Sequence, residues 1–423
     1  MIYLLVNHVA FAPGRSRARF RLPEAHLTDL RATAAAIAGV GGRLIVAAPR
    51  CGPNDASPAA RSPSRQTEFS PDAEGFEFVP LPFYINLRQY WRARTGLETA
   101  LRAIIPATDV VQMDYAGHPI MLAETAWPIA GEMGKPRVFV FDAHDPFPSM
   151  QADARRTANP VRRAARRKLM DRRIAFCRSA VAEASLVITH NDQTSRRFRT
   201  AWDERRCHEL LPPPVLNDAD VLSSTELETR LRARADRRKT LRLLCPTHGP
   251  AADPAIRALA HCRRLSVPVS LTIIVPGENS ADLREMAGGL AMIEHVQFVE
   301  PSPDVAGALA GEHDVLLSTG PEGENGFDPR LLRAMGCGMA VVTYDDPATV
   351  RLLEQNAAAI IVPRGNVLLL AQAVIDLQQN RRRLIELAEN AWRFAASRTL
   401  EAAHRRRAEL AMALLGQTTP TAR

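Results

Sequence analysis

The stretch DVLLSTGPEGENGFDPRLLRAMGCGMAVVTYD, residues 314–345, places a turn and a helix between two apolar runs. The runs at 314–318 and 340–343 are rich in Val, Leu and Ala. Short apolar runs on either side of a helix are typical of strands buried in a parallel sheet. The stretch therefore predicts a strand–helix–strand unit of an α/β fold.

The helix of this unit has a recognisable start. Asp328 is a good N-cap and Pro329 a good first helical residue, so the sequence predicts a helix over 329–335. Gly326 stands just before it, in the turn. Because the free N–H groups of a first helical turn attract negative charge, this turn is a candidate anion site. A tight strand-to-helix turn that holds no ligand is the open alternative.

The same alternation of strand and helix patterns continues on both sides of this unit. It predicts two doubly wound α/β domains, with ligands at the carboxyl ends of the strands, in a cleft between the domains. The predicted strands lie at 3–6, 43–48, 76–79, 109–113, 137–142, 186–189, 241–245, 269–275, 296–299, 314–318, 340–343 and 359–362.

Domain limits follow from breaks in this pattern. Three consecutive prolines at 212–214 begin a charged stretch, so we predict a linker at 212–240. It separates an N-terminal domain, 1–211, from a C-terminal domain, 241–398. The apolar series in 399–423 predicts a final helix that returns to the N-terminal domain. The Pro-, Ser- and Ala-rich region 52–75 is predicted to be a mobile loop.

Composition narrows the class of protein. The chain has 423 residues, of which 46% are hydrophobic and 24% charged, as in folded globular proteins. Six cysteines without CxxC spacing favour neither a zinc site nor a disulfide framework, so we expect no metal and a cytoplasmic protein with reduced thiols. The apolar start resembles a buried strand more than a signal peptide. The formal net charge of +8 favours anionic partners: phosphates, lipid headgroups or nucleic acid.

Five segments together resemble a known family. They are YLLVNHVAFAPG (3–14), DVVQMDYAGHP (109–119), GKPRVFVFDAHD (134–145), ASLVITHNDQTSRRF (184–198) and AMGCG (334–338). In this order they are similar to the group 1 family of retaining glycosyltransferases, and the similarity covers nearly the whole chain. The family has the GT-B fold, in which two Rossmann-like domains face each other across a cleft.

The resemblance implies an activity. A sugar would pass from a nucleotide- or phosphate-linked donor to a hydroxyl of an acceptor, with retention of the anomeric configuration and without a cofactor or metal. The acceptor would be a glycan, a lipid-linked glycan or a small molecule. His144 and Asp145 match the family's His-Asp cleft motif and are the implied catalytic residues. The helix end after Gly326 and Phe327 would hold the donor's diphosphate.

The chain departs from the family at the donor site. The two usual glutamates correspond to Asn325 and Arg333, with Glu324 as a neighbour of the first. Arginine only donates hydrogen bonds, so Arg333 cannot accept them from ribose hydroxyls. These departures leave a non-catalytic GT-B relative, the partner or scaffold of another transferase, as the alternative function.

The phosphate clamp departs as well. Thr247 and His248 stand where the family tends to have Arg and Lys, and Asp328 adds a negative charge near the donor's phosphates. The basic loop with Gly14, Arg15 and Arg17 is a candidate replacement for the missing charge. Alternatively, Arg333 binds an anionic group on an unusual donor.

A basic segment, 155–178, contains ten Arg or Lys residues and one acid, Asp171. It predicts either a solvated helix with an apolar stripe packed on the first domain, or a peripheral contact with an anionic membrane at its inner face. The aromatic and basic residues of 83–94 present the same pair of alternatives. Nucleic-acid binding is disfavoured because no known binding module accompanies the charge.

Overall fold

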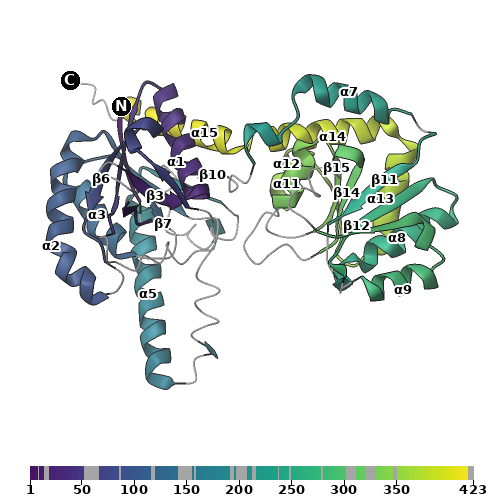
Figure 1. The fold of residues 1–423 in the computed structure, drawn as a ribbon, viewed down its shortest axis with the longest axis horizontal. Coiled ribbons are helices and arrows are strands. Elements are labelled where there is room, and N and C mark those ends of the chain that lie inside the picture. Colours follow the sequence, from purple (N-terminus) through teal and green to yellow (C-terminus); the bar gives the residue numbers. More distant parts are fainter. Residues whose placement is uncertain are drawn as a thin grey trace. The chain divides into compact units, whose positions relative to one another are not determined.

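The chain folds into two compact units in a computed structural model (Figure 1). Unit 1 comprises Met1–Pro213 and Glu401–Arg423, and unit 2 comprises Pro214–Leu400. The structure describes residues 1–7, 9–13, 19–51, 66–84, 87–115, 120–141, 155–156, 159–190, 195–196, 207–211, 216–236, 238–246, 249–277, 280–301, 311–320, 329–345 and 350–417.

Unit 1 is built on a parallel sheet in the order β10-β9-β8-β7-β1-β4-β6. Its strands are β1 (Ile2–Val6), β4 (Arg43–Pro49), β6 (Phe76–Leu81), β7 (Val110–Tyr115), β8 (Arg137–Phe141), β9 (Leu186–Thr189) and β10 (Cys207–Leu210). Successive residues of β1 face opposite cores: Leu4 and Val6 one, Tyr3 and Leu5 the other. Both faces of the sheet are therefore buried, which explains the continuous apolar runs.

Helices cover both faces of this sheet. The core that includes Leu4 also takes in buried residues of α2 (Leu87–Ile104), α3 (Ile120–Glu132) and α5 (Pro160–Glu183). The core that includes Tyr3 takes in residues of α1 (Glu24–Gly39) and α15 (Leu400–Gln417). The last helix is also joined to α1 by polar contacts, since the ring of buried His404 lies 2.9 Å from Asp29 Oδ1 and 3.0 Å from Thr33 Oγ1.

Unit 2 has a second parallel sheet, in the order β13-β12-β11-β14-β15-β16. Its strands are β11 (Leu241–Cys245), β12 (Val269–Ile274), β13 (Val296–Val299), β14 (Val315–Ser318), β15 (Ala340–Tyr344) and β16 (Ile360–Val362). Its helices are α7 (Ser224–Arg234), α8 (Asp253–Arg264), α9 (Ala281–Gly289), α11 (Pro329–Gly336), α12 (Val350–Gln355), α13 (Val367–Gln379) and α14 (Arg381–Ala396). The largest core lies where α8, α9 and α13 pack on one face, while α11 and α14 contact β15.

One glycine fixes the passage from α11 to β15. Gly338 has φ +70°, in the left-handed region that favours glycine, and a Cβ there would stand 2.6 Å from Leu227 Cδ1. The backbone conformation therefore favours glycine at position 338, and any larger residue would also have to displace the Leu227 side chain of α7.

The two doubly wound parallel sheets predicted from the sequence are confirmed. The sequence did not indicate a small antiparallel sheet formed by β2 (Ala12–Pro13), β3 (Phe20–Pro23) and β5 (Gln66–Phe69). The last of these strands lies in the region 52–75 that we predicted as a mobile loop, so that part of the prediction was wrong. The stretch predicted as a linker likewise contains α7, whose N-cap Ser223 and Glu226 form a capping box.

Candidate functional site

The strand order of unit 2 defines where a ligand is expected. From β11 the chain proceeds outward through β12 and β13, and then returns to place β14 on the other side of β11. The direction of winding thus changes between β11 and β14. In open parallel sheets, ligands bind outside the carboxyl ends of the strands at this switch point.

Small polar groups lie at the switch point. Thr319 follows β14, is buried, and donates a hydrogen bond from Oγ1 to the carbonyl of Ala251 at 2.7 Å. The same oxygen lies 3.5 Å from Sγ of Cys245, the last residue of β11. These contacts tie the two strand ends to the segment leading into α8.

Arg330 brings a positive charge to the same place. It lies in the first turn of α11, and its Nη1 donates to the carbonyl of Pro246, directly after β11, at 2.5 Å. Leu331 and Leu332 are fully buried beside it, whereas Arg330 is exposed. The packing of α11 therefore directs a guanidinium to the carboxyl end of β11.

Tyr344 ends β15 at the same edge of the sheet. Only 3% of the residue is exposed, and its hydroxyl has no hydrogen-bond partner within the described part of the chain. Burial raises the pKa of this hydroxyl, while the nearby Arg364 guanidinium opposes the shift. The next residue, Asp345, accepts a hydrogen bond from the backbone N–H of Arg364 at 2.7 Å. The edge thus holds a buried polar atom that no other described residue bonds.

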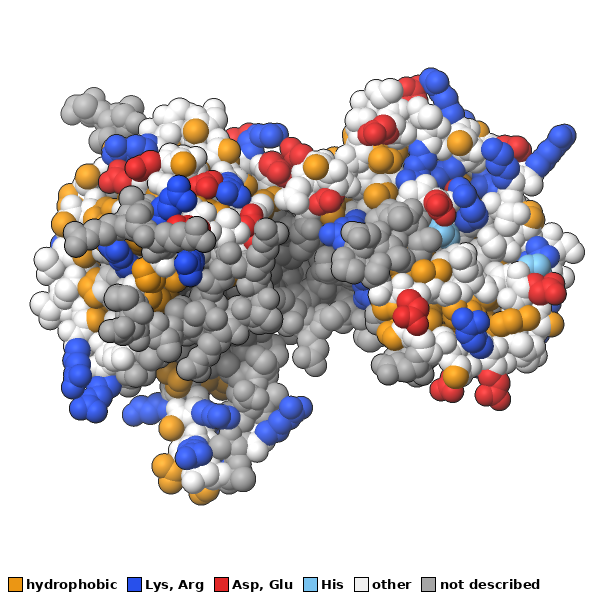
Figure 2. All heavy atoms as spheres, in the orientation of Figure 1, with side chains coloured by type: hydrophobic (Ala, Val, Ile, Leu, Met, Phe, Trp, Pro, Cys, Tyr) orange, Lys and Arg blue, Asp and Glu red, His pale blue; other side chains and the backbone are white. Residues whose placement is uncertain are grey.

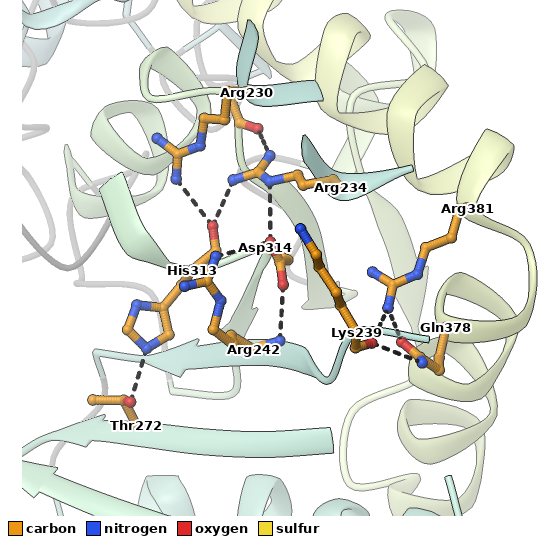
Figure 3. Close-up of polar contacts among 10 residues, drawn as sticks. Arg230, Arg234, Lys239, Arg242, Thr272, His313, Asp314, Gln378 and Arg381 are labelled. Carbon is orange, nitrogen blue, oxygen red and sulfur yellow. Dashed lines mark hydrogen bonds and ion pairs between the residues drawn. The ribbon is translucent and has the colours of Figure 1, made fainter. Parts of the chain in front are cut away.

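The opposite, amino edge of the sheet holds a network of charged side chains (Figure 3). Asp314, just before β14, is 5% exposed at its side chain and lies 3.1 Å from Nε of Arg234. It also accepts the backbone N–H of Arg242 at 3.0 Å. The carbonyl of His313 accepts from both Arg230 and Arg234. These groups bind one another and the backbone. We therefore infer that the network holds α7 against the sheet.

Most residues predicted for the site lie outside the described residues. These are Gly14, Arg15, Arg17, His144, Asp145, Thr247, His248, Glu324, Asn325, Gly326, Phe327 and Asp328. Their roles therefore stay predictions. Arg333 is described: it lies in α11, half-buried, one turn before Cys337. Burial raises the pKa of the Cys337 thiol, and the charges of Arg230 and Arg333 oppose that rise.

Polar residues of unit 1 left without a role by the sequence have local partners. His190, at the end of β9, is buried, and its Nδ1 lies 2.5 Å from the carbonyl of Leu211. Burial, followed by the charge of Arg407, lowers the pKa of His190 to about 4, so the ring is neutral at pH 7. Asp114, at the end of β7, accepts from Gln112 Nε2 at 2.6 Å.

Among the described residues, no group of three or more His, Cys, Asp or Glu is arranged to hold a metal ion. No helix in that same part of the chain is long and apolar enough to cross a membrane.

Sequence reasoning missed Arg330 and Thr319. A signal for each was present, since Thr319 directly follows a predicted strand and Arg330 is the second residue of a predicted helix. The contact of Arg330 with Pro246, however, depends on which strand lies next to β14. That neighbour is fixed by the order of the folded sheet.

The chain is similar to known proteins in sequence and in fold. Residues 248–380 match the family model of glycosyl transferases group 1. The chain is 34% identical over 113 residues to a phosphatidyl-myo-inositol mannosyltransferase of Mycobacterium leprae, covering 26% of this chain and 29% of that one. It is 28% identical over 214 residues to a GDP-mannose-dependent alpha-(1-6)-phosphatidylinositol monomannoside mannosyltransferase of Mycolicibacterium smegmatis, covering 48% and 55%. The aligned regions thus span about half, or less, of these relatives' lengths.

Among solved structures, the chain is similar to the Anabaena protein HepE in complex with UDP, with a TM-score of 0.54 and 14% identity. That similarity covers 98% of this chain and 100% of the other, and it concerns the fold. The chain therefore has the GT-B fold, and residues 248–380 are similar to the group 1 glycosyltransferases. The predicted resemblance is confirmed at this level.

Proposed function

We propose that this protein is a glycosyltransferase that moves a sugar from a donor with a phosphate leaving group to a hydroxyl of an acceptor. The group 1 domain and the GT-B fold support this class of reaction. As in the resembled family, we propose transfer with retention. The names of the curated relatives make GDP-linked mannose and a phosphatidylinositol-type lipid the first donor and acceptor classes to test. Since Arg333 cannot accept hydrogen bonds from ribose hydroxyls, we expect a guanosine diphosphate-sugar to bind weakly, and sugar phosphates are tested beside it.

The position of Arg330 carries the proposal. During transfer, the bond between the sugar's anomeric carbon and the phosphate oxygen breaks, and the bonding electrons stay on the phosphate. A guanidinium presents five N–H donors in a planar fork suited to phosphate oxygens. The bond of Arg330 to the Pro246 carbonyl holds that fork at the switch point, beside the first turn of α11. Fixed positive charge of this kind stabilises a departing phosphate.

Arg330 also supplies a positive charge where the sequence after β11 has none. The segment after β11 lacks the Arg and Lys that the resembled family tends to have there, and Thr247 and His248 carry no permanent charge. A guanidinium from α11 supplies charge at the end of the same strand. In this proposal Asn325, Gly326 and the neighbouring turn contact the donor.

His144 and Asp145 complete the proposed machinery. His144 would bond a hydroxyl of the transferred sugar or move its proton, as suits an imidazole near neutral pH. Replacing a group in such a role lowers turnover by roughly 100-fold or more.

The decisive experiment compares ligand binding by the unmodified protein and Arg330→Gln. Calorimetry with nucleotides, nucleotide-sugars and sugar phosphates should find at least one ligand, and the variant should bind it about 10- to 100-fold more weakly, as for a lost charged hydrogen bond. Arg382→Gln is the matched control, because Arg382 is an exposed helical arginine paired with Glu386 in α14. Equal affinity of Arg330→Gln and the control would contradict the proposed role.

A non-catalytic GT-B relative is the second candidate function. The observation that favours it is the arginine at position 333, where the resembled family has a carboxylate. Under this alternative, no member of the ligand panel would bind, and no sugar would be transferred to any acceptor. Transfer of a sugar to an acceptor that is weakened in Arg330→Gln and not in Arg382→Gln would decide for the transferase.

A further inference from the structure

The first turns of α5 extend away from the rest of unit 1 (Figure 1). Every residue from 159 to 169 is exposed, and regular burial begins only at Arg173 and Cys177. A helix that packs along a domain buries a side chain every third or fourth residue. The start of α5 therefore lacks the buried stripe that normally stabilises a surface helix.

Repulsion among the positive charges of this segment destabilises the helix in which they lie. Arg162 and Arg166, Arg163 and Arg167, and Lys168 and Arg172 are like charges four residues apart, a spacing that destabilises a helix. The first turn contains no acidic residue. Positive charge there also opposes the helix dipole.

Local contacts hold the helix in place despite this repulsion. Asn159 caps the N-terminus by accepting from the backbone N–H groups of Val161 and Arg162 at 3.0 and 3.1 Å. Further along, Arg172 makes two hydrogen bonds to Glu124 of α3, at 3.1 and 2.6 Å. The chain thus maintains a projecting helix with closely spaced cationic side chains, a charge pattern complementary to a polyanionic partner.

Exposed apolar groups accompany the cations, as the mixture of Lys, Arg and hydrophobic side chains on this projection indicates (Figure 2). Val161 is 76% exposed and Leu169 is 44% exposed. Trp91 of α2, 52% exposed, shares a groove with Arg172 and Phe176 of α5. Tryptophan and cationic side chains together are typical of surfaces that meet the headgroup region of a bilayer.

We infer that the segment 159–172 of α5, with Trp91 at its base, is a docking surface for an anionic phospholipid bilayer. Several cations near such a surface are attracted to it, and the attraction extends over about a Debye length. A nucleic acid would pair with the cationic side chains but would offer no apolar environment to the hydrophobic ones. The exposed Val161, Leu169 and Trp91 have an apolar environment to enter only in the bilayer, which favours the membrane.

The inference can be tested with vesicles and the full chain. Unmodified protein should sediment with vesicles that contain about a third phosphatidylglycerol, and much less with pure phosphatidylcholine. The variant R162Q/R163Q/R166Q/R167Q should bind the anionic vesicles roughly 100-fold more weakly. Glutamine is a good helix former, and circular dichroism will check that the helix is retained.

A control variant separates a local surface from total charge. R232Q/R382Q/R383Q/R393Q removes the same number of charges from exposed residues of α7 and α14, and should bind vesicles as the unmodified protein does. Equal losses in both variants would overturn the inference, since only net charge would then matter.

The apolar contribution is tested by V161Q/L169Q. We expect a loss of about 10-fold that persists at about 0.5 M salt, where charge attraction is largely screened. Tight binding of a single- or double-stranded RNA through the four arginines, with no vesicle binding, would also overturn the inference. No donor or acceptor is present in these assays, so their outcome is independent of the proposed transferase activity.

Discussion

Polar residues lie at both edges of the unit 2 sheet, and the two groups differ in the partners that they bind. At the amino edge, Asp314, Arg234 and their neighbours are buried and bind one another (Figure 3). At the carboxyl edge, Arg330 donates to the backbone carbonyl of Pro246, and the hydroxyl of Tyr344 has no partner in the described part of the chain. The denser group of charges, at the amino edge, therefore stabilises the fold, whereas the carboxyl edge is the candidate ligand site.

This difference has a physical reason. A buried ion pair is tolerated only when each partner's charge and hydrogen bonds are satisfied, so it has little left for a ligand. A ligand site needs groups whose capacity is unused before binding. Position at the carboxyl ends of the strands, together with a Tyr344 hydroxyl that has no partner among the described residues, thus marks the candidate site in this unit.

The largest expected effect tests the amino edge. Asp314→Asn leaves the Arg234 guanidinium buried without its carboxylate, which should lower the free energy of unfolding by about 3–5 kcal/mol. Urea denaturation of the full chain measures this. Ligand affinity of the folded variant should not change, because Asp314 lies at the opposite edge of the sheet.

Asp376→Asn is the control for that substitution. Asp376 lies 3.5 Å from Arg383, with 39% of its own side chain exposed, so the change should cost less than about 1 kcal/mol. If both variants lost equal stability, the amino-edge network would be no more than a surface ion pair.

The second prediction concerns the carboxyl edge and Arg333. A carboxylate that accepts ribose hydroxyls contributes roughly 1.5–3 kcal/mol, and Arg333 cannot accept. We therefore expect standard uridine and guanosine diphosphate-sugars to bind the unmodified protein weakly, and Arg333→Glu to bind them about 10-fold or more tightly. Calorimetry on both forms measures the difference.

Arg333→Gln separates two explanations of such a gain. It removes the positive charge without adding a carboxylate, so an equal gain would point to simple charge removal. Tight binding of a standard nucleotide-sugar by the unmodified protein would show that another residue accepts hydrogen bonds from the ribose hydroxyls. Loss of native activity in Arg333→Glu would support a role for Arg333 toward an anionic group of the donor.

The sequence predicted elements whose signals are local. Apolar runs gave strands such as β11, and the Asp-Pro pair gave the start of α11, because caps and burial patterns involve few neighbouring residues. It missed β5, since that short strand is held by pairing with Phe20 and its neighbours, far away in the sequence. It also missed α7, whose buried Leu227 and Leu231 are separated by charged residues.

The contacts of the candidate site were beyond the reach of local patterns. The bond from Arg330 to Pro246 joins residues 84 positions apart. It exists because β14, the strand that precedes α11 in the chain, lies beside β11. A residue type and a position in a turn can be read from the sequence, but the partner across the sheet follows from the order of the strands.

The smallest expected effect concerns the hydroxyl of Tyr344. A buried hydroxyl without a partner costs free energy, so Tyr344→Phe should leave the protein as stable as before or more stable by up to about 1 kcal/mol. Thermal unfolding without ligand measures this.

If a bound donor uses the hydroxyl, the ligand-induced rise in Tm will be smaller in the variant than in the unmodified protein. Tyr84→Phe is the control in unit 1, because its hydroxyl is also buried there, beside the backbone of Leu122. A loss of more than about 1 kcal/mol in Tyr344→Phe alone would mean that the hydroxyl is already bonded in the free protein, and would remove the contrast between the two edges.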